Sequence, residues 1–177
     1  VHTDARGYAR AIAEGKDGTM WVGEPGGLDR LDPNSMAVLP RLSDTPAADI
    51  AALCQDGLGT LWIGTLGGGL IRFDEGGWSR CTARDGLPGN SVAYLVPHGS
   101  AMLWIGTSAG LMRVDRTVMD DFHRGTRPGI EGRVYGKADG LPTRECTMGA
   151  QPAARPSLAD TLWFPSIQGL AMVEPSQ

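Results

Sequence analysis

The stretch LWIGTLGGGLIRFD, residues 61–74, places two short apolar runs on either side of three consecutive glycines. Such a glycine run is typical either of a phosphate-binding loop or of a turn between two strands. A P-loop needs a lysine after the last glycine and a helix after that. Here residues 67–69 are followed by a second strand-like run with no lysine. We therefore interpret the glycines as a strand-connecting turn that requires positive φ.

The same pattern recurs along the chain, each time around a tryptophan. The four phrases are TMWVGEPGGLDRLDP, TLWIGTLGGGLIRFD, MLWIGTSAGLMRVD and TLWFPSIQGLAMVEP, and their tryptophans are spaced 41, 42 and 59 residues apart. A β-like run precedes each phrase, and a further run follows it, as in residues 78–82. No helical periodicity persists anywhere. Four short strands in about 42 residues are the pattern of a β-propeller blade.

The repeat predicts an all-β fold, a β-propeller built of four-stranded antiparallel blades, with about four blades in this chain. The predicted blades cover residues 8–45, 49–87, 91–138 and 145–177, with an insertion within residues 116–137. An isolated blade cannot bury both of its faces. We therefore expect the four tryptophans, Trp21, Trp62, Trp104 and Trp163, to pack between neighbouring blades.

Three arrangements of the end blades remain open. In the first, the chain closes on itself as a four-bladed ring. In the second, a second chain completes the ring. In the third, the chain is one segment of a larger propeller. The last predicted blade lacks a fourth strand after Glu174. A strand at residues 1–3 would be one way to supply it.

Composition excludes several classes of function. Hydrophobic residues make up 41% of the 177 residues and charged residues 20%, which is an ordinary globular balance. The net charge of −4 and the absence of a basic run argue against nucleic-acid binding. The three cysteines form no close pair, which argues against a disulfide framework and a CxxC metal site. The three histidines occupy unrelated positions of the repeat, so no metal site and no cofactor are expected.

The second unit carries a family resemblance. Its QD dipeptide, then GTLWIGT, GGLIRFD and DGLPGNSV, resemble the two-component regulator propeller repeat. The resemblance is looser in the first unit and weakest in the last, where Phe164-Pro165-Ser166 replaces the expected IGT. It implies a sensor region on the periplasmic or extracellular face of a bacterial inner-membrane protein, often a hybrid histidine kinase. It further implies an extracytoplasmic ligand such as an oligosaccharide, membrane contact only through other parts of the parent protein, and no catalysis by this chain.

The candidate ligand-binding residues lie where the turn after the second strand meets the turn before the first strand, because propeller loops at one end of the channel usually carry function. Arginine, asparagine and tyrosine suit a sugar, since they combine hydrogen bonding with a stacking surface. The repeated acids Asp32, Asp74 and Asp115 are instead expected to cap turns. The candidate site residues are Arg10, Glu24, Thr65, Asn90, Tyr94 and Thr107.

Two other functions were weighed. One is a propeller lyase resembling the streptogramin B lyases, which need a metal and a catalytic histidine on one face; this sequence offers no such cluster. The other is a scaffold that only mediates homo-oligomerisation. The expected partners are thus a carbohydrate ligand and a second copy of the chain.

Overall fold

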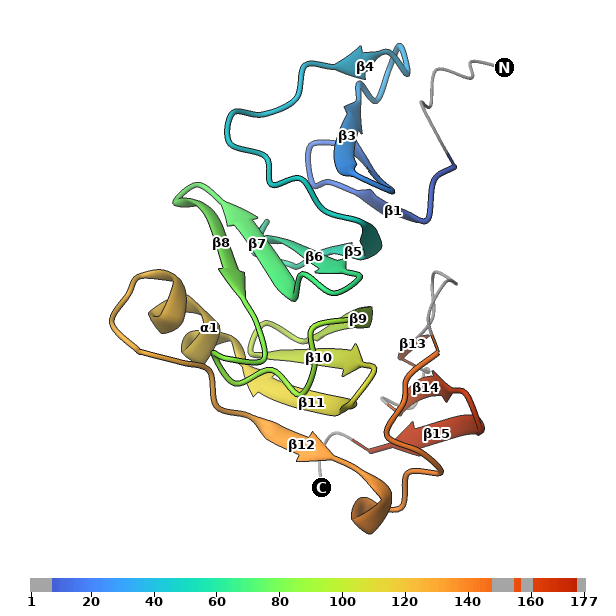
Figure 1. Ribbon diagram of the computed structural model, residues 1–177. Helices are drawn as coiled ribbons and strands as arrows, with labels where there is room; N and C mark the ends of the chain where they lie inside the picture. The colour runs from blue at the N-terminus through green and yellow to red at the C-terminus, as the bar shows by residue number, and fades with distance from the viewer. Residues whose placement is uncertain (1–7, 148–154, 157–160, 175–177) are drawn as a thin grey trace.

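The computed structural model describes residues 8–147, 155–156 and 161–174, and these form four antiparallel sheets arranged in an open arc (Figure 1). Blade 1 contains β1 (Ala11–Glu14), β2 (Met20–Glu24), β3 (Gly27–Leu31) and β4 (Val38–Leu39). Blade 2 contains β5 (Ile50–Gln55), β6 (Leu61–Thr65), β7 (Leu70–Asp74) and β8 (Gly77–Cys81). Blade 3 contains β9 (Val92–His98), β10 (Met102–Thr107), β11 (Gly110–Asp115) and β12 (Arg133–Tyr135). Blade 4 has three described strands, β13 (Arg155–Pro156), β14 (Leu162–Ser166) and β15 (Gly169–Val173).

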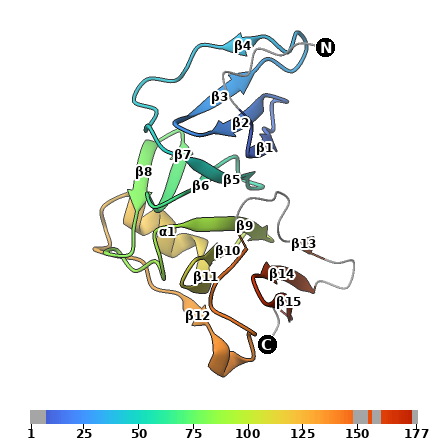
Figure 2. The same ribbon diagram turned by 45° about the vertical axis from the view of Figure 1, so that its right-hand side comes forward.

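The predicted all-β propeller architecture is therefore confirmed. The inner strands β1, β5 and β9 lie side by side along the concave side of the arc (Figures 1 and 2). Blade 4 continues this order, since Cys146 forms an isolated antiparallel bridge with Ser166, as Ile50 pairs with Thr65 in blade 2. The proposed closing strand at residues 1–3 lies outside the described residues.

The glycine run is a turn, as predicted. Gly67 and Gly69 have φ values of 82° and 84°, which favour glycine. The amide of Gly69 donates to the carbonyl oxygen of Asn90 at 2.8 Å, so the turn also holds the loop that leads into blade 3.

Each blade packs its tryptophan against the next blade in the chain. Trp21 shares a core cluster with Ile50, Leu53 and Ile63 of blade 2. Trp62 lies in the same way among residues of blade 3, including Val92, Leu95 and Leu103. Trp104 packs on Phe164, Leu162 and Ala171 of blade 4. These three tryptophans are buried, which confirms their predicted role in packing.

An arginine lies opposite each of these tryptophans on the neighbouring strand, and its guanidinium carbon lies over the indole ring. The carbon-to-centroid distances are 5.7 Å for Arg30 over Trp21, 5.7 Å for Arg72 over Trp62 and 5.8 Å for Arg113 over Trp104. These are cation–π contacts. Arg72 is buried in the interface between blades 2 and 3, so in each of these three blades the arginine covers the indole ring.

The fourth tryptophan differs. Trp163 is 39% exposed, and its cross-strand partner is Met172 in place of an arginine. Its surroundings explain the difference, because no further blade follows it in the described chain. The sequence pattern identifies the tryptophan position, but the tryptophan is buried only where a following blade packs against it.

The insertion contains a helix that the sequence analysis missed. α1 (Arg116–His123) directly follows β11 and is capped by Asp115, whose side chain accepts a hydrogen bond from the Thr117 amide at 2.8 Å. Met119 is buried, and Val118 and Phe122 pack against the core between blades 2 and 3. The expectation that no helical segment interrupts the repeat was wrong here. The aspartate cap followed by apolar residues at 118, 119 and 122 was the available signal.

Candidate functional site

The two turns expected to form one rim do meet in the structure. The amide of Leu66, after the second strand of blade 2, donates to the carbonyl oxygen of Asp49, before the first strand, at 2.8 Å. In blade 3 the amide of Ser108 donates to the carbonyl oxygen of Ser91 at 3.0 Å. The rim of the concave side is therefore built by a repeated backbone contact.

The two rim threonines are fully buried. The hydroxyl of Thr65 donates to the carbonyl oxygen of Gly69 at 2.7 Å, and that of Thr107 donates to the carbonyl oxygen of Gly110 at 2.9 Å. The structure thus shows both side chains closing the turn between the second and third strands. Their predicted part in ligand binding stays a prediction.

Tyr94 is also buried, and it links blade 3 to blade 4. Its ring stacks on Phe164 with centroids 5.6 Å apart, and its hydroxyl donates to Cys146 Sγ at 2.9 Å. Burial raises the pKa of Tyr94 above its usual value, with a smaller contribution from Cys146. Burial likewise raises the pKa of the Cys146 thiol, although the Tyr94 hydrogen bond opposes this. Tyr94 and Cys146 are therefore both uncharged, and they pack in the interface between blades 3 and 4.

The remaining candidates differ in exposure. Glu24 is buried at the end of β2. Asn90 is exposed, and its side-chain oxygen accepts from the Ala83 amide at 2.7 Å.

Arg10 forms the most ligand-like arrangement of the six, together with a neighbour that sequence reasoning missed. Its guanidinium carbon lies 5.1 Å from the centroid of the Tyr8 ring, and its Nη2 donates to the Tyr8 hydroxyl at 2.6 Å. Tyr8 is 65% exposed. The Arg10 amide donates to the Gly23 carbonyl oxygen at 2.9 Å, so the pair stands at the rim beside the end of β2. An aromatic residue two positions before a rim arginine was the signal in the sequence.

A second charged constellation joins blade 2 to α1. Nη2 of Arg72 lies 2.6 Å from Asp74 Oδ2 and 2.7 Å from Asp120 Oδ1. His123 Nε2 lies 3.6 Å from Asp74 Oδ1. These groups border an open cleft of about 330 Å3, together with Gly76 and Arg124. Because the opposite charges are paired with one another, the arrangement holds the helix against the blade.

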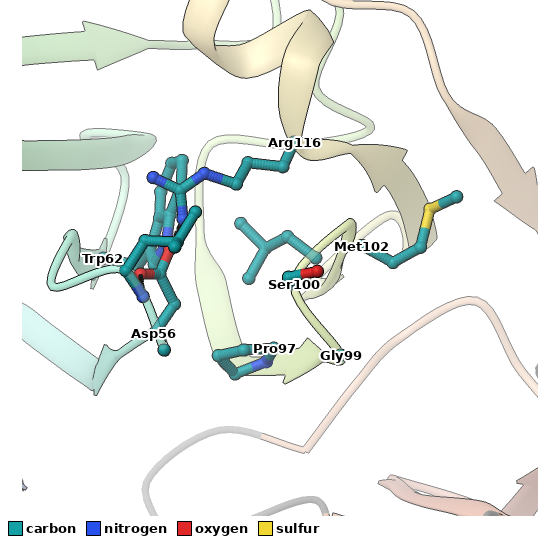
Figure 3. Close-up of a pocket in the computed structure, with 10 residues that line it drawn as sticks. Asp56, Trp62, Pro97, Gly99, Ser100, Met102 and Arg116 are labelled. Atoms are coloured by element: carbon teal, nitrogen blue, oxygen red, sulfur yellow. Dashed lines mark hydrogen bonds and ion pairs between the residues drawn. The ribbon is translucent and has the colours of Figure 1, made fainter.

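The helix is fastened at its first residue by Arg116. Its Nη1 forms an ion pair with Asp56 Oδ2, and its Nη2 donates to Thr60 Oγ1 at 2.6 Å. Asp56 Oδ2 also accepts from Trp62 Nε1 at 2.9 Å. Figure 3 shows Arg116 reaching over Trp62 toward Asp56, across a small pocket from Pro97 and Ser100. That pocket holds about 10 Å3, room for about one water molecule, so it is no sugar site.

The acids of the repeat cap turns, as expected. Asp32 accepts from the Asn34 and Ser35 amides, and Asp74 accepts from the Gly76 amide. Among the described residues, no group of three or more histidine, cysteine or acidic side chains could hold a metal ion. No helix in that part of the chain is long and apolar enough to cross a membrane.

Comparisons with known proteins agree with this architecture. Residues 45–67, which contain β5 and β6, match the family Two component regulator propeller. The resemblance found in the sequence is confirmed over these residues. Among curated proteins, none matches the chain.

Solved structures share the fold at low sequence identity. The extracellular domain of the hybrid two component system BT3049 from B. thetaiotaomicron matches with a TM-score of 0.76 and 17% identity, over 98% of this chain and 23% of that one. The corresponding domain of BT4673 from the same organism matches with a TM-score of 0.75 and 20% identity, over 96% and 24%. Virginiamycin B lyase from Staphylococcus aureus matches with a TM-score of 0.64 and 12% identity, over 99% and 55%. This chain thus spans about a quarter of the length of the two extracellular domains, and its propeller fold is the one they contain.

Proposed function

We propose that this chain is part of the extracytoplasmic sensor region of a two-component regulator, and that it binds a ligand without catalysing a reaction. The family match at residues 45–67 and the likeness to two sensor ectodomains support this assignment. The more distant likeness to a lyase concerns the shared fold, and no described cluster of side chains resembles a metal centre.

We further propose that the ligand is an oligosaccharide and that it stacks on Tyr8. The carrying observation is the Tyr8–Arg10 pair at the rim. Sugar rings present apolar C–H faces that pack on aromatic rings, while their hydroxyls need charged or polar partners. The guanidinium fixes the tyrosine ring and offers donors beside it, so the pair is organised before the ligand arrives.

A titration of the chain with a panel of neutral and acidic oligosaccharides, followed by calorimetry, tests the proposal. We expect saturable binding of at least one sugar and loss of that binding in the Tyr8→Ala variant. Binding that is unaffected by Tyr8→Ala would move the site elsewhere. Turnover of a streptogramin in the presence of a divalent metal would replace the sensor assignment by the lyase.

A further inference from the structure

One position at the rim recurs along the chain, directly before the inner strand of a blade. Its carbonyl oxygen accepts a hydrogen bond from the first amide of the turn after the second strand. Asp49 makes this contact in blade 2, and Ser91 makes it in blade 3. Blade 4 repeats it, since the amide of Ile167 donates to the carbonyl oxygen of Glu145 at 3.3 Å. We call these places the rim positions.

Tyr8 occupies the rim position of blade 1. Ala11 in β1 and Ala52 in β5 hold matching places in the register, because each pairs with the glycine before the last residue of the second strand. Tyr8 lies three residues before Ala11, and Asp49 lies three residues before its counterpart. The rim positions therefore carry one aromatic ring, two carboxylates and one hydroxyl, which belong to Tyr8, Asp49, Glu145 and Ser91.

Asp49 belongs to the same part of the rim as the Tyr8–Arg10 pair. Its Oδ1 accepts from the amide of Gly26 at 2.8 Å, in the turn after β2. The Arg10 amide donates to the carbonyl oxygen of Gly23, near the start of the same turn. Both residues are thus fastened to residues 23–26 of blade 1. Asp49 is exposed, and its Oδ2 has no hydrogen-bond partner among the residues that the structure describes.

These groups favour a ligand that donates hydrogen bonds. A carboxylate only accepts, and it accepts from several hydroxyls at once. Hydrogen bonds to an ionised acceptor are the stronger kind. An acidic sugar would instead bring a second carboxylate close to Asp49. Arg10 already donates to Tyr8 through Nη2 and its Nη1 is buried, so its two terminal nitrogens cannot hold a ligand carboxylate together.

We propose that Asp49 selects neutral saccharides at this site. It accepts hydrogen bonds from hydroxyls of the sugar that stacks on Tyr8, and it repels sugars that carry a carboxylate. Glu145, exposed at the rim position of blade 4, adds to the same negative charge. A charge that disfavours the wrong ligand is a common source of specificity. This inference rests on the proposed function, because it names the class of sugar that the Tyr8 site takes.

Calorimetric titration with matched sugars tests the selection. Each neutral oligosaccharide is paired with the uronic-acid oligosaccharide of the same linkage and length, for example α-1,4-linked galactotriose with trigalacturonic acid. We expect the wild-type chain to bind a neutral member at least about tenfold more tightly than its acidic counterpart. Asp49→Asn keeps an oxygen that can accept from the Gly26 amide but removes the charge. It should bind the neutral sugar about tenfold more weakly and lose the preference over the acidic one.

Asp121→Asn is the matched control, because it removes an exposed carboxylate on α1, outside the rim. It should leave both affinities unchanged, and circular dichroism should show both variants folded. Neutral-sugar binding that is lost in Tyr8→Ala but unchanged in Asp49→Asn would keep the proposed function and overturn this inference. Tighter binding of the acidic members would overturn it too. If no sugar of the panel binds the wild-type chain, the proposed function fails and the inference fails with it.

Discussion

Asp56 and Arg116 form a buried ion pair although they lie 60 residues apart in the sequence. Asp56 directly follows β5, the first strand of blade 2, whereas Arg116 is the first residue of α1. The same carboxylate accepts from Trp62 Nε1 and from the Leu58 and Thr60 amides. One side chain therefore caps a turn, satisfies a core indole and anchors α1.

Asp56→Ala should lower the free energy of unfolding by about 3–5 kcal/mol, because it leaves the Arg116 guanidinium buried without this partner. Urea unfolding monitored by circular dichroism measures the change. Asp121→Ala, which removes the exposed pair with Arg124, is the matched control and should cost about 0–1 kcal/mol. The double variant Asp56→Ala/Arg116→Met should be more stable than Asp56→Ala alone, since no unpaired buried charge remains. Equal losses at Asp56 and Asp121 would contradict the anchoring role.

Gly64→Ala should destabilise the chain by about 1–3 kcal/mol through overpacking between blades 2 and 3. A Cβ at Gly64 would lie 2.7 Å from Val92 Cγ1 and 3.1 Å from the Val92 carbonyl oxygen. Gly57→Ala is the control, since its Cβ would meet no atom within 4 Å, and it should change stability by less than about 0.5 kcal/mol. Thermal unfolding of both variants compares them directly. A Gly64→Ala variant as stable as Gly57→Ala would mean that the blades are not in close contact there.

Stability should fall as the pH rises above about 8. Burial raises the pKa of Cys81 to about 12 and raises the pKa values of Cys54, Cys146 and Tyr94 as well. Above the thiol pKa of the unfolded chain, about 8.5, the unfolded state binds fewer protons than the native state, so the free energy of unfolding decreases as pH rises. The stabilisation from the buried Cys81 thiol is fully present below about pH 8.5 and is lost as the pH rises from there to about 12.

Urea unfolding at several pH values from 7 to 10 measures this slope. Replacing Cys81 by Ala removes one of the groups, so the slope should become shallower by up to about 1.4 kcal/mol per pH unit. Unchanged stability up to pH 10 would show that the thiols are not held neutral.

Tyr8→Ala should weaken binding of the proposed oligosaccharide by about tenfold, the effect of losing one stacking contact of roughly 1.4 kcal/mol. Tyr8→Phe should retain most of the affinity, because the ring remains and only the hydroxyl contact to Arg10 is lost. Calorimetric titration of the three proteins distinguishes stacking from hydrogen bonding. If the phenylalanine variant binds as poorly as the alanine variant, the hydroxyl and not the ring face is what the sugar needs.

The repeat made the blades predictable because strand periodicity and turn glycines are local properties. The interfaces followed from the recurring tryptophan, but only up to blade 4, because no further blade covers Trp163 among the described residues. The cap at Asp115 shows another limit. Asp32 and Asp74 make the same hydrogen bond to the amide two residues on, yet only Asp115 continues into a helix, since the apolar residues after it find a core to enter.

The candidate site was less predictable. Thr65 and Thr107 stand at the rim as expected, but their hydroxyls have partners within their own turns. The distinction between a rim hydroxyl that faces solvent and one that closes a turn depends on side-chain rotation, which the sequence does not encode locally. The Asp56–Arg116 ion pair could not be predicted from the sequence, because only the stacking of blades 2 and 3 brings those two segments together.

Asp56 also makes the interfaces between blades unequal in stability. Its counterparts in blades 1 and 3 are Gly15 and His98, and among the described residues the indole nitrogens of Trp21 and Trp104 have no hydrogen-bond partner. In a linear array of blades, stability is a sum of nearest-neighbour terms. Blades 2 and 3, joined by the helix and the ion pair, should therefore be the last unit to exchange their amide protons.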